Sequence, residues 1–395
     1  MKRAPSAGPK KNPKTGTWGF VIDLGEGYDV RGVWRERRQV RRRGFATKAA
    51  AQEALDQVRS DARQGTHVLR DDLTVGDWLD HWLLTSAARV KPSTHHFYES
   101  KIDGYIRPRV GDLRLQQLDT ATIDRLYAEL IVSGRASGKG GLSVSTVRHV
   151  ATILRMSLNA AVRARKLQFN PALSAQAPRH NATGRPEMTT WTAEQLARFL
   201  HLERDTRYSA IWTFLALTGC RRGEALGLRW DDVDFDTSRV TLRRTITSVG
   251  HEVLHSNDTK TSKGRTIRLQ PELVAALKAQ RKDQAEERLL LGAGYHDDGL
   301  VFAKANGEAL HPDHFSREFT RRVKRSGLPK IRLHDLRHTY ATLALAAGVP
   351  AKVVADRLGH SSVTITLDLY SHVMPAVEGD HADTVARLIT DASPS

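Results

Sequence analysis

Four residues near the carboxy-terminal end of the sequence have side chains suited to work on a phosphate group: His334, Arg337, His360 and Tyr370. His334 and Arg337 are three residues apart in a predicted helix, so their side chains share one face of it. His360 follows Gly359, where a helix has ended, which leaves its imidazole and the nearby amides free to meet a ligand. With Tyr370 at the end of the next predicted helix, the set indicates an anionic substrate and a phenolic nucleophile.

Three short helices are predicted to position these side chains. The first begins near His334 and ends at Gly348, with a proline just beyond it as a stop signal. The second runs to Gly359, and the third begins after a serine N-cap at position 361 or 362 and ends around Tyr370.

Four motifs that carry these residues resemble those of the tyrosine recombinases, or phage-type integrases. They are TGCRRGEALGLRW from Thr218, HDLRHTYAT from His334, RLGHSS from Arg357 and LDLYSHV from Leu367. Any one of them is a moderate signal, whereas four in this order and at these spacings form a strong one. The resemblance covers nearly the whole chain, because the regions before these motifs also resemble the accessory domains of that family.

The resemblance implies that Tyr370 attacks a DNA phosphodiester, which gives a 3′-phosphotyrosine link and a free 5′ hydroxyl. Arg221 and Arg337 would hold the two non-bridging oxygens, whose negative charge grows as phosphorus becomes five-coordinate. Rigid guanidinium forks match that geometry better than ammonium groups do, and they stabilise the charge without a metal. Arg222 adjoins Arg221, but the TG-x-R spacing selects Arg221.

The proton transfers need further residues. A phenol titrates near pH ~10, so Tyr370 needs a proton acceptor, and His334 is the predicted general base, acting directly or through the phosphate. Lys260 stands where the family carries its general-acid lysine, with Lys263 as a close competitor in the same short loop. His360 would donate a hydrogen bond to a phosphate oxygen.

Four other residues of these motifs receive different interpretations. Glu224 and Asp335 are interpreted as buttresses that orient the arginine and the histidine. Tyr340 lies in the middle of its helix, where burial of its ring on the apolar face disfavours it as the nucleophile. His334 and His338 have the i, i+4 spacing of a zinc-protease helix, but that motif needs a glutamate beside its first histidine, and no third ligand is evident. His338 is therefore interpreted as an ordinary helix residue, and neither a metal nor a cofactor is predicted.

The composition favours a polyanionic partner. The 395 residues include 61 Lys and Arg against 44 Asp and Glu, which gives a net charge of +17 and a pI near 10.1. No apolar run approaches the ~18 residues of a spanning helix, and no signal-peptide pattern opens the chain. The single Cys220 excludes an internal disulfide framework and a cysteine-based zinc site. We expect a cytoplasmic, nucleoid-associated bacterial protein, encoded by a phage or an integrative element, with no membrane partner.

Residues 1–70 are predicted to form a basic DNA-binding module. They contain 16 Lys and Arg against 7 Asp and Glu, more than half of the excess positive charge of the chain. Alternating apolar residues predict a strand over 18–24, two further strands follow around 30–34 and 39–45, and a helix runs from 48 to about 64. The module resembles the family's arm-site-binding domain, which lays a sheet into a DNA groove. A solvated basic face is the alternative. Its candidate DNA contacts are Arg35, Arg37, Arg38, Arg41, Arg42 and Arg43.

Residues 71–170 look entirely helical, with helices expected over 118–131 and 143–165 among others. Trp78 and Trp82 stand at helical spacing and are expected in the core. By resemblance this is the core-binding domain, a helical bundle that closes over one side of the duplex. The last helix carries arginines suited to phosphate contacts, namely Arg148, Arg155 and Arg163.

A linker rich in Pro, Ala and Gly is predicted at 171–190, and the catalytic domain at 191–395. Such a linker would let two DNA-gripping lobes form a clamp. In the catalytic domain, 234–247 and 264–269 are predicted strands with the polar turn NDTKTSKGR between them. Beyond Tyr370 a short helix is expected from His381 to Ile389. In the family such a tail packs on the neighbouring subunit, and packing on its own domain is the alternative.

The predicted fold class is thus multidomain and mainly α, with a small β-sheet-plus-helix N-terminal domain, a helical core-binding bundle and an α+β catalytic domain. The predicted activity is that of a site-specific recombinase, an integrase that integrates or excises a mobile element through a four-way junction. Its expected partners are double-stranded DNA with core and arm attachment sites, three further copies of itself in a homotetramer on DNA, a DNA-bending host factor and an excision factor. Neither ATP nor a metal is expected to be required.

Two alternatives use the same residues. A type IB topoisomerase has similar chemistry but acts as a monomer. A sequence-specific DNA-binding protein could retain the motifs without activity, although the intact set of six residues argues against it. That set is Arg221, Lys260, His334, Arg337, His360 and Tyr370.

Overall fold

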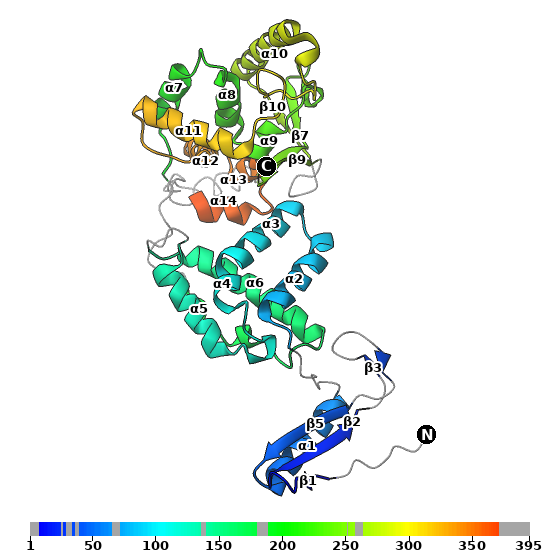
Figure 1. The fold of residues 1–395 in the computed structure, drawn as a ribbon. Helices are drawn as coiled ribbons and strands as arrows, with labels where there is room; N and C mark the ends of the chain where they lie inside the picture. Colours follow the sequence, from blue (N-terminus) through cyan, green and yellow to red (C-terminus); the bar gives the residue numbers. More distant parts are fainter. Residues whose placement is uncertain are drawn as a thin grey trace, which may run out of the picture. The chain divides into compact units, whose positions relative to one another are not determined.

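Two units make up the computed structural model, Met1–Thr183 and Gly184–Ser395, and each is described by itself (Figure 1). The structure describes residues 8–24, 27–28, 34–35, 39–64, 72–135, 140–179, 189–250, 252–256 and 264–370. Several predicted features lie outside these residues: Arg37, Arg38, Lys260, Lys263 and the tail helix expected at 381–389.

The first part of the amino-terminal unit is a small sheet covered by one helix. Strands β1 (Lys10–Lys11), β2 (Trp18–Asp23) and β5 (Gln39–Phe45) pair antiparallel in the order β1-β2-β5, followed by α1 (Lys48–Gln64), while β3 (Gly27–Tyr28) and β4 (Trp34–Arg35) pair with each other. The alternating pattern of β2 buries Phe20 and Ile22 against Leu55 and Val58 of α1. The residues of β5 that pair with β2 include Arg41 to Arg43, and these arginines are exposed at the edge of this sheet.

The second part of this unit is a bundle of α2 (Val75–Ser86), α3 (Pro92–Lys101), α4 (Arg107–Val110), α5 (Thr120–Ser133) and α6 (Val144–Arg163). A π-helical turn, Ile102–Ile106, joins α3 to α4, and 3-10 turns occupy Ala87–Arg89 and Leu115–Gln117. Trp78 and Trp82 are buried in its core as predicted, and the Trp78 Nε1–H donates to the Ser157 carbonyl at 2.9 Å. On α6, Arg148, Arg155 and Arg163 are exposed.

The start of the predicted linker packs on this bundle. Pro171–Leu173 forms a 3-10 turn capped by Asn170, and Pro171 and Ala172 are buried. The Gln176 amide donates to Asp124 of α5 at 2.7 Å. The chain is therefore tied to the bundle as far as residue 176.

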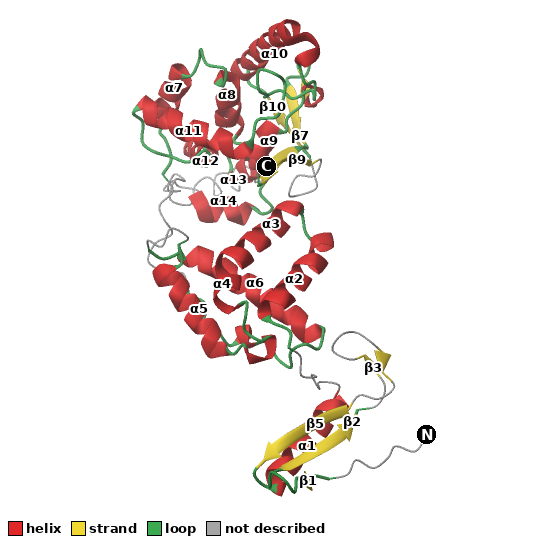
Figure 2. Ribbon diagram, in the orientation of Figure 1, coloured by secondary structure: helices red, strands yellow, loops and turns green. Residues whose placement is uncertain are grey.

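In the residues that the structure describes, the carboxy-terminal unit is mainly helical with two small sheets, which confirms the predicted fold class (Figure 2). Its helices are α7 (Ala193–Leu202), α8 (Ser209–Thr218), α9 (Arg222–Leu226), α10 (Pro271–Leu291), α11 (Pro312–Ser326), α12 (Asp335–Ala346), α13 (Ala351–Leu358) and α14 (Val363–Tyr370). Its strands are β6 (Val233–Asp234), β7 (Arg239–Leu242), β8 (Thr245–Val249), β9 (Glu252–Ser256) and β10 (Arg265–Arg268), paired antiparallel in the order β10-β7-β6 and as a β8-β9 hairpin. The three helices predicted around the motifs are present.

One strand prediction is wrong. Residues 234–247 do not form a single strand, because the Asp234 carboxylate accepts hydrogen bonds from the amides of Asp236 and Thr237 and closes a turn. Ser238 completes that turn with φ 50°. Downstream, β9 is a further strand that was not predicted; it directly precedes the expected polar turn and pairs with β8.

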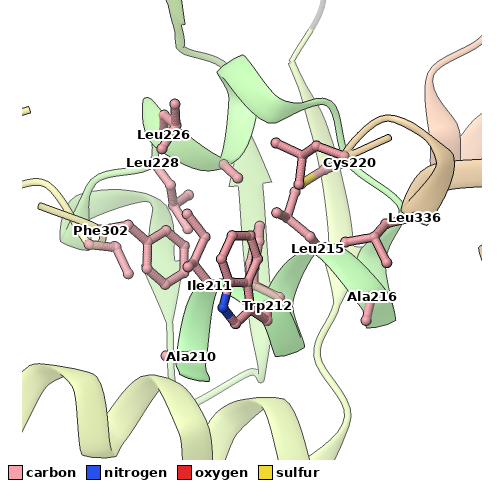
Figure 3. Packing of buried hydrophobic residues seen from close by; sticks show 14 of the residues in the cluster. Ala210, Ile211, Trp212, Leu215, Ala216, Cys220, Leu226, Leu228, Phe302 and Leu336 are labelled. Atoms are coloured by element: carbon pink, nitrogen blue, oxygen red, sulfur yellow. The ribbon is translucent and has the colours of Figure 1, made fainter. Parts of the chain in front are cut away.

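Helix α8 is apolar on every side and runs through the middle of the core. Figure 3 shows Ile211, Trp212 and Leu215 packed among side chains that include Leu226 and Phe302. The helix ends at Gly219, whose φ of 61° is left-handed. A Cβ at this glycine would lie 2.6 Å from the Tyr340 ring, so the glycine allows the end of α8 to approach α12 closely.

Among the helices that the structure describes, none is long and apolar enough to cross a membrane.

Candidate active site

The predicted catalytic residues of the carboxy-terminal unit come from four element ends. Arg221 follows Gly219 and Cys220 after the end of α8, and it is the N-cap of α9. Arg337 lies in the first turn of α12, His360 follows the left-handed Gly359 that ends α13, and Tyr370 is the last residue of α14. The core that packs these helices together therefore also sets the spacing of the site.

Arg221 is held from two sides. Its Nη1 donates to Glu224 Oε1 at 2.9 Å, and its Nη2 donates to the Gly359 carbonyl at 2.8 Å. The Arg221 amide also donates to Glu224 Oε2 at 2.8 Å. Because 31% of the side chain is exposed, the guanidinium is fixed in direction and still open to a ligand.

Glu224 is the buried centre of this network, and Arg265 is its second partner. Arg265 of β10 donates from both Nη atoms to the two carboxylate oxygens, at 2.9 and 2.6 Å, and its Nε donates to the Arg357 carbonyl at 2.9 Å. Burial raises the pKa of Glu224, but the hydrogen bonds and charge of Arg265, together with Arg221, outweigh burial and hold the pKa at about 2. The carboxylate is therefore charged at neutral pH, and its predicted role as a buttress for Arg221 agrees with these contacts.

Arg337 is buried, with 4% of its surface exposed, and its Nη1 donates to the Gly219 carbonyl at 2.9 Å. Burial and the nearby charge of Arg221 lower the pKa of Arg337 to about 10, so the group remains cationic at neutral pH. Arg221, Arg265 and Arg337 thus surround the single carboxylate of Glu224. The resulting excess of positive charge suits an anion with several oxygens.

Asp335 contacts a different partner from the predicted one. It accepts hydrogen bonds from the amide of Arg332 at 2.7 Å and from the Arg332 Nη2 at 2.8 Å, and not from a histidine. Asp335 therefore fixes the first turn of α12, where a carboxylate is also favoured by the helix dipole.

Two predicted histidines lie near Arg337. His334 is the N-cap residue of α12 and its surface is exposed, but the protein atoms around its ring, together with the neighbouring His338 and Arg337, lower its pKa. The His360 Nδ1 is 2.8 Å from the Thr366 hydroxyl, and burial with the charges of Arg337 and Arg221 lowers its pKa to about 4. Both imidazoles are thus neutral at pH ~7, a state in which each offers one N–H donor.

The Tyr370 hydroxyl contacts His338, which was interpreted from the sequence as an ordinary helix residue. Its Oη lies 2.5 Å from Nδ1 of His338, and only 1% of the tyrosine is exposed. The ring packs on Leu345 of α12 and Leu358 of α13. Burial raises the pKa of Tyr370 to about 12. In the sequence, the feature that could have drawn attention to His338 is its position next to Arg337.

The residues that the sequence disfavoured are engaged elsewhere. Arg222 donates to the Pro312 carbonyl and to the Ser316 hydroxyl of α11, at 2.9 and 2.7 Å. Tyr340 has the Arg357 guanidinium 5.6 Å above its ring. Across the described residues, no group of three or more side chains is placed to hold a metal ion.

Comparisons with known proteins identify the family of this chain. The phage integrase family matches residues 188–376, the SAM-like amino-terminal domain of phage integrases matches 74–131, and the arm DNA-binding domain matches 10–62. A tyrosine recombinase XerC-like protein of Caldanaerobacter subterraneus subsp. tengcongensis is 27% identical over 359 residues, which are 86% of this chain and 89% of that protein.

Two solved structures show the same fold. The integrase of the Tn1549 transposon, in complex with a circular intermediate DNA, has a TM-score of 0.65 and 22% identity, covering 80% of this chain and 99% of that chain. A lambda integrase tetramer bound to a Holliday junction has a TM-score of 0.55 and 18% identity, covering 92% and 98%. The chain therefore belongs to the phage integrase family of tyrosine recombinases, enzymes that cleave and rejoin DNA.

Proposed function

We propose that this chain is the integrase of a mobile element and that Tyr370 is its nucleophile. The observation that carries the proposal is the cationic cluster of Arg221 and Arg337. It lies just beyond the end of α8, beside the buried Glu224. Two guanidinium groups, fixed before any substrate arrives, can bind both non-bridging oxygens of a phosphodiester and stabilise the charge that develops on them.

The proposed reaction forms one bond and breaks one. The Tyr370 oxygen attacks phosphorus while the bond from phosphorus to the 5′ oxygen breaks, which leaves a 3′-phosphotyrosine and a 5′ hydroxyl. The phenolic proton passes to a histidine at the start of α12, where His334, the N-cap residue, was predicted as the general base. Lys260 donates the proton that the 5′ oxygen takes up. His360 contributes a neutral donor to a phosphate oxygen.

The remaining parts of the chain are proposed to bind the DNA. Residues 1–70 would bind arm sites through the exposed arginines of β5, and residues 71–170 would bind core sites through the exposed arginines of α6. Residues 171–190 would link them to a catalytic domain at 191–395. Four copies would act on a four-way junction, as the tetrameric arrangement of the lambda integrase structure supports. A DNA-bending host factor and an excision factor would assist, on DNA of the bacterial nucleoid in the cytoplasm.

The test uses a suicide DNA substrate, nicked near a core site that the protein binds, with EDTA present. We expect the intact chain to form a covalent complex on a denaturing gel, and Tyr370→Phe to form none. Tyr340→Phe is the matched control, since it removes the same atom from a tyrosine of the neighbouring helix, and it should keep the complex.

Each other outcome rejects part of the proposal. A band that survives in Tyr370→Phe places the nucleophile elsewhere. No band on a bound site favours a DNA-binding protein without activity. Covalent cleavage without any recombination between two sites favours a type IB topoisomerase.

A further inference from the structure

The Tyr370 hydroxyl contacts His338 before any DNA is bound. The 2.5 Å distance joins the nucleophilic oxygen itself to an imidazole nitrogen, and both residues are buried. We propose that His338 is an additional catalytic residue, the immediate acceptor of the phenolic proton when Tyr370 attacks phosphorus. This inference rests on the proposed function and deepens it, because it assigns the first proton transfer to a residue outside the predicted set.

The positions of the two α12 histidines favour His338 over His334 in this role. The two rings stand edge to face, with centroids 5.0 Å apart, one helical turn from each other. His338 lies on the side of α12 that packs on α14, with its ring centroid 5.8 Å from that of Tyr370. His334 is the exposed N-cap residue. His338 can therefore serve the tyrosine while His334 remains open to the phosphate.

The resting proton positions follow from the environment. Because burial keeps the phenol protonated at neutral pH, its O–H donates to Nδ1, and neutral His338 then carries its own proton on Nε2. In the attack, the Oη–phosphorus bond forms, the bond to the 5′ oxygen breaks, and the phenolic proton moves to Nδ1 to give an imidazolium. In the reverse step, ligation, the same proton returns to the departing Tyr370 oxygen.

The proton transfer must accompany the attack and cannot precede it. Burial lowers the pKa of His338, whereas burial raises that of Tyr370 to about 12, so a phenolate–imidazolium pair is unfavourable in the resting enzyme. Attack on phosphorus makes the phenol oxygen strongly acidic and brings negative charge beside the new imidazolium. Several charged and titratable groups face His338. They are Asp335 and Arg337 of α12, Arg332 and His334 just before α12, His360 after α13, and Tyr370 of α14.

A purely structural role of His338 predicts a different result from a catalytic role, and two substitutions distinguish these roles. His338→Asn places an amide near the former Nδ1, so it can hold the tyrosine by a hydrogen bond but cannot take a proton. His338→Ala removes both abilities and leaves a cavity that free imidazole can enter. Thermal unfolding and binding to the uncleaved core site would show that both variants are folded.

The measurement is the single-turnover rate of covalent complex formation by the full chain on the suicide substrate, from pH 5.5 to 9. We expect His338→Asn to lose about 100-fold in rate and to lose the histidine-dependent acid limb of the pH profile. We expect added imidazole to restore part of the rate of His338→Ala and none of the rate of Tyr370→Phe. If the Asn variant retains the parental rate and pH profile, His338 is not the proton acceptor.

The failures of the two proposals can be told apart. If the parental chain forms no covalent complex on a site that it binds, the proposed function and the role of His338 both fail. If the parental complex forms and depends on Tyr370, but substitution of His338 changes neither rate nor pH profile, the role of His338 alone is overturned.

Discussion

The arginine side of the active site and the tyrosine side are built differently. Arg221 and Glu224 belong to a closed network in which Arg265 and the Gly359 carbonyl complete the hydrogen bonds. In the part of the chain that the structure describes, the Tyr370 side chain has one hydrogen bond, to His338, and packs in a small apolar cluster at the end of an eight-residue helix. The electrostatic half of the site is therefore fixed in advance, whereas the nucleophile can be repositioned at small cost.

This difference fits the chemistry of the family. Stabilisation of a developing charge is most effective when the donors need no reorganisation during the reaction. A nucleophile that becomes covalently linked to DNA must instead move with its substrate. The following predictions test the contrast, beginning with the largest expected effect.

Replacing Glu224 by Gln should damage both stability and activity. The substitution leaves Arg221, Arg265 and Arg337 close together without a counter-charge, and breaking a buried ion pair in this way costs about 3–5 kcal/mol. We expect urea unfolding to show that loss and the cleavage rate to fall at least ~100-fold. Asp313→Asn, which removes the exposed partner of Arg222, is the control and should cost under ~1 kcal/mol. Equal stability of Glu224→Gln and the parent would contradict the closed network.

The same carboxylate predicts how stability depends on pH. The pKa of Glu224 is lowered from 4.5 to about 2 on folding, so its contribution of about 3 kcal/mol to the free energy of unfolding is complete above pH ~5. It is lost as the pH falls from there through ~2, with about 2 kcal/mol gone by pH ~3. Urea titrations at pH 7 and pH 3 should show this loss in the parent and not in Glu224→Gln. An equal pH dependence in both proteins would assign the acid sensitivity to other groups.

Sequence patterns located the residues that lie within motifs and missed those defined by contacts between motifs. Arg221 and Arg337 were predicted because each lies in a motif that resembles one of the family's motifs. Arg265 meets Glu224 across 41 residues of chain, and His338 meets Tyr370 across 32, so neither pairing has a local signature. The broken strand at 234–247 shows the same limit, since the side chain of Asp234 competes with the β pairing that the apolar pattern favours.

Replacing Arg265 by Lys should separate positioning from charge. Lysine keeps the positive charge but cannot donate to both oxygens of Glu224 and to the Arg357 carbonyl together. We expect the cleavage rate to fall about 10-fold with little change in affinity for the core site, because Arg221 loses its fixed direction. Arg268→Lys, on the same strand but exposed, should leave the rate unchanged. A loss of DNA affinity without a loss of rate would show that Arg265 contacts DNA and does not act through Glu224.

Hydrogen exchange should reveal the contrast in the chain without DNA, although the effect is the smallest. Helix α14 buries only Thr366 and Tyr370 and exposes Ile365 and Leu367, whereas seven of the ten residues of α8 are buried. Local opening costs least where few apolar contacts are lost, so we expect the α14 amides to exchange at least ~10-fold faster than those of α8.

His338→Ala would sharpen this measurement, because loss of the hydrogen bond to Tyr370 should accelerate exchange in α14 and leave α8 unchanged. Exchange in α14 as slow as in α8 would remove the contrast, since the nucleophile would then be as firmly held as the arginines. In that case the attack would need DNA binding to break a stable helix packing, and the rate of helix release would limit cleavage.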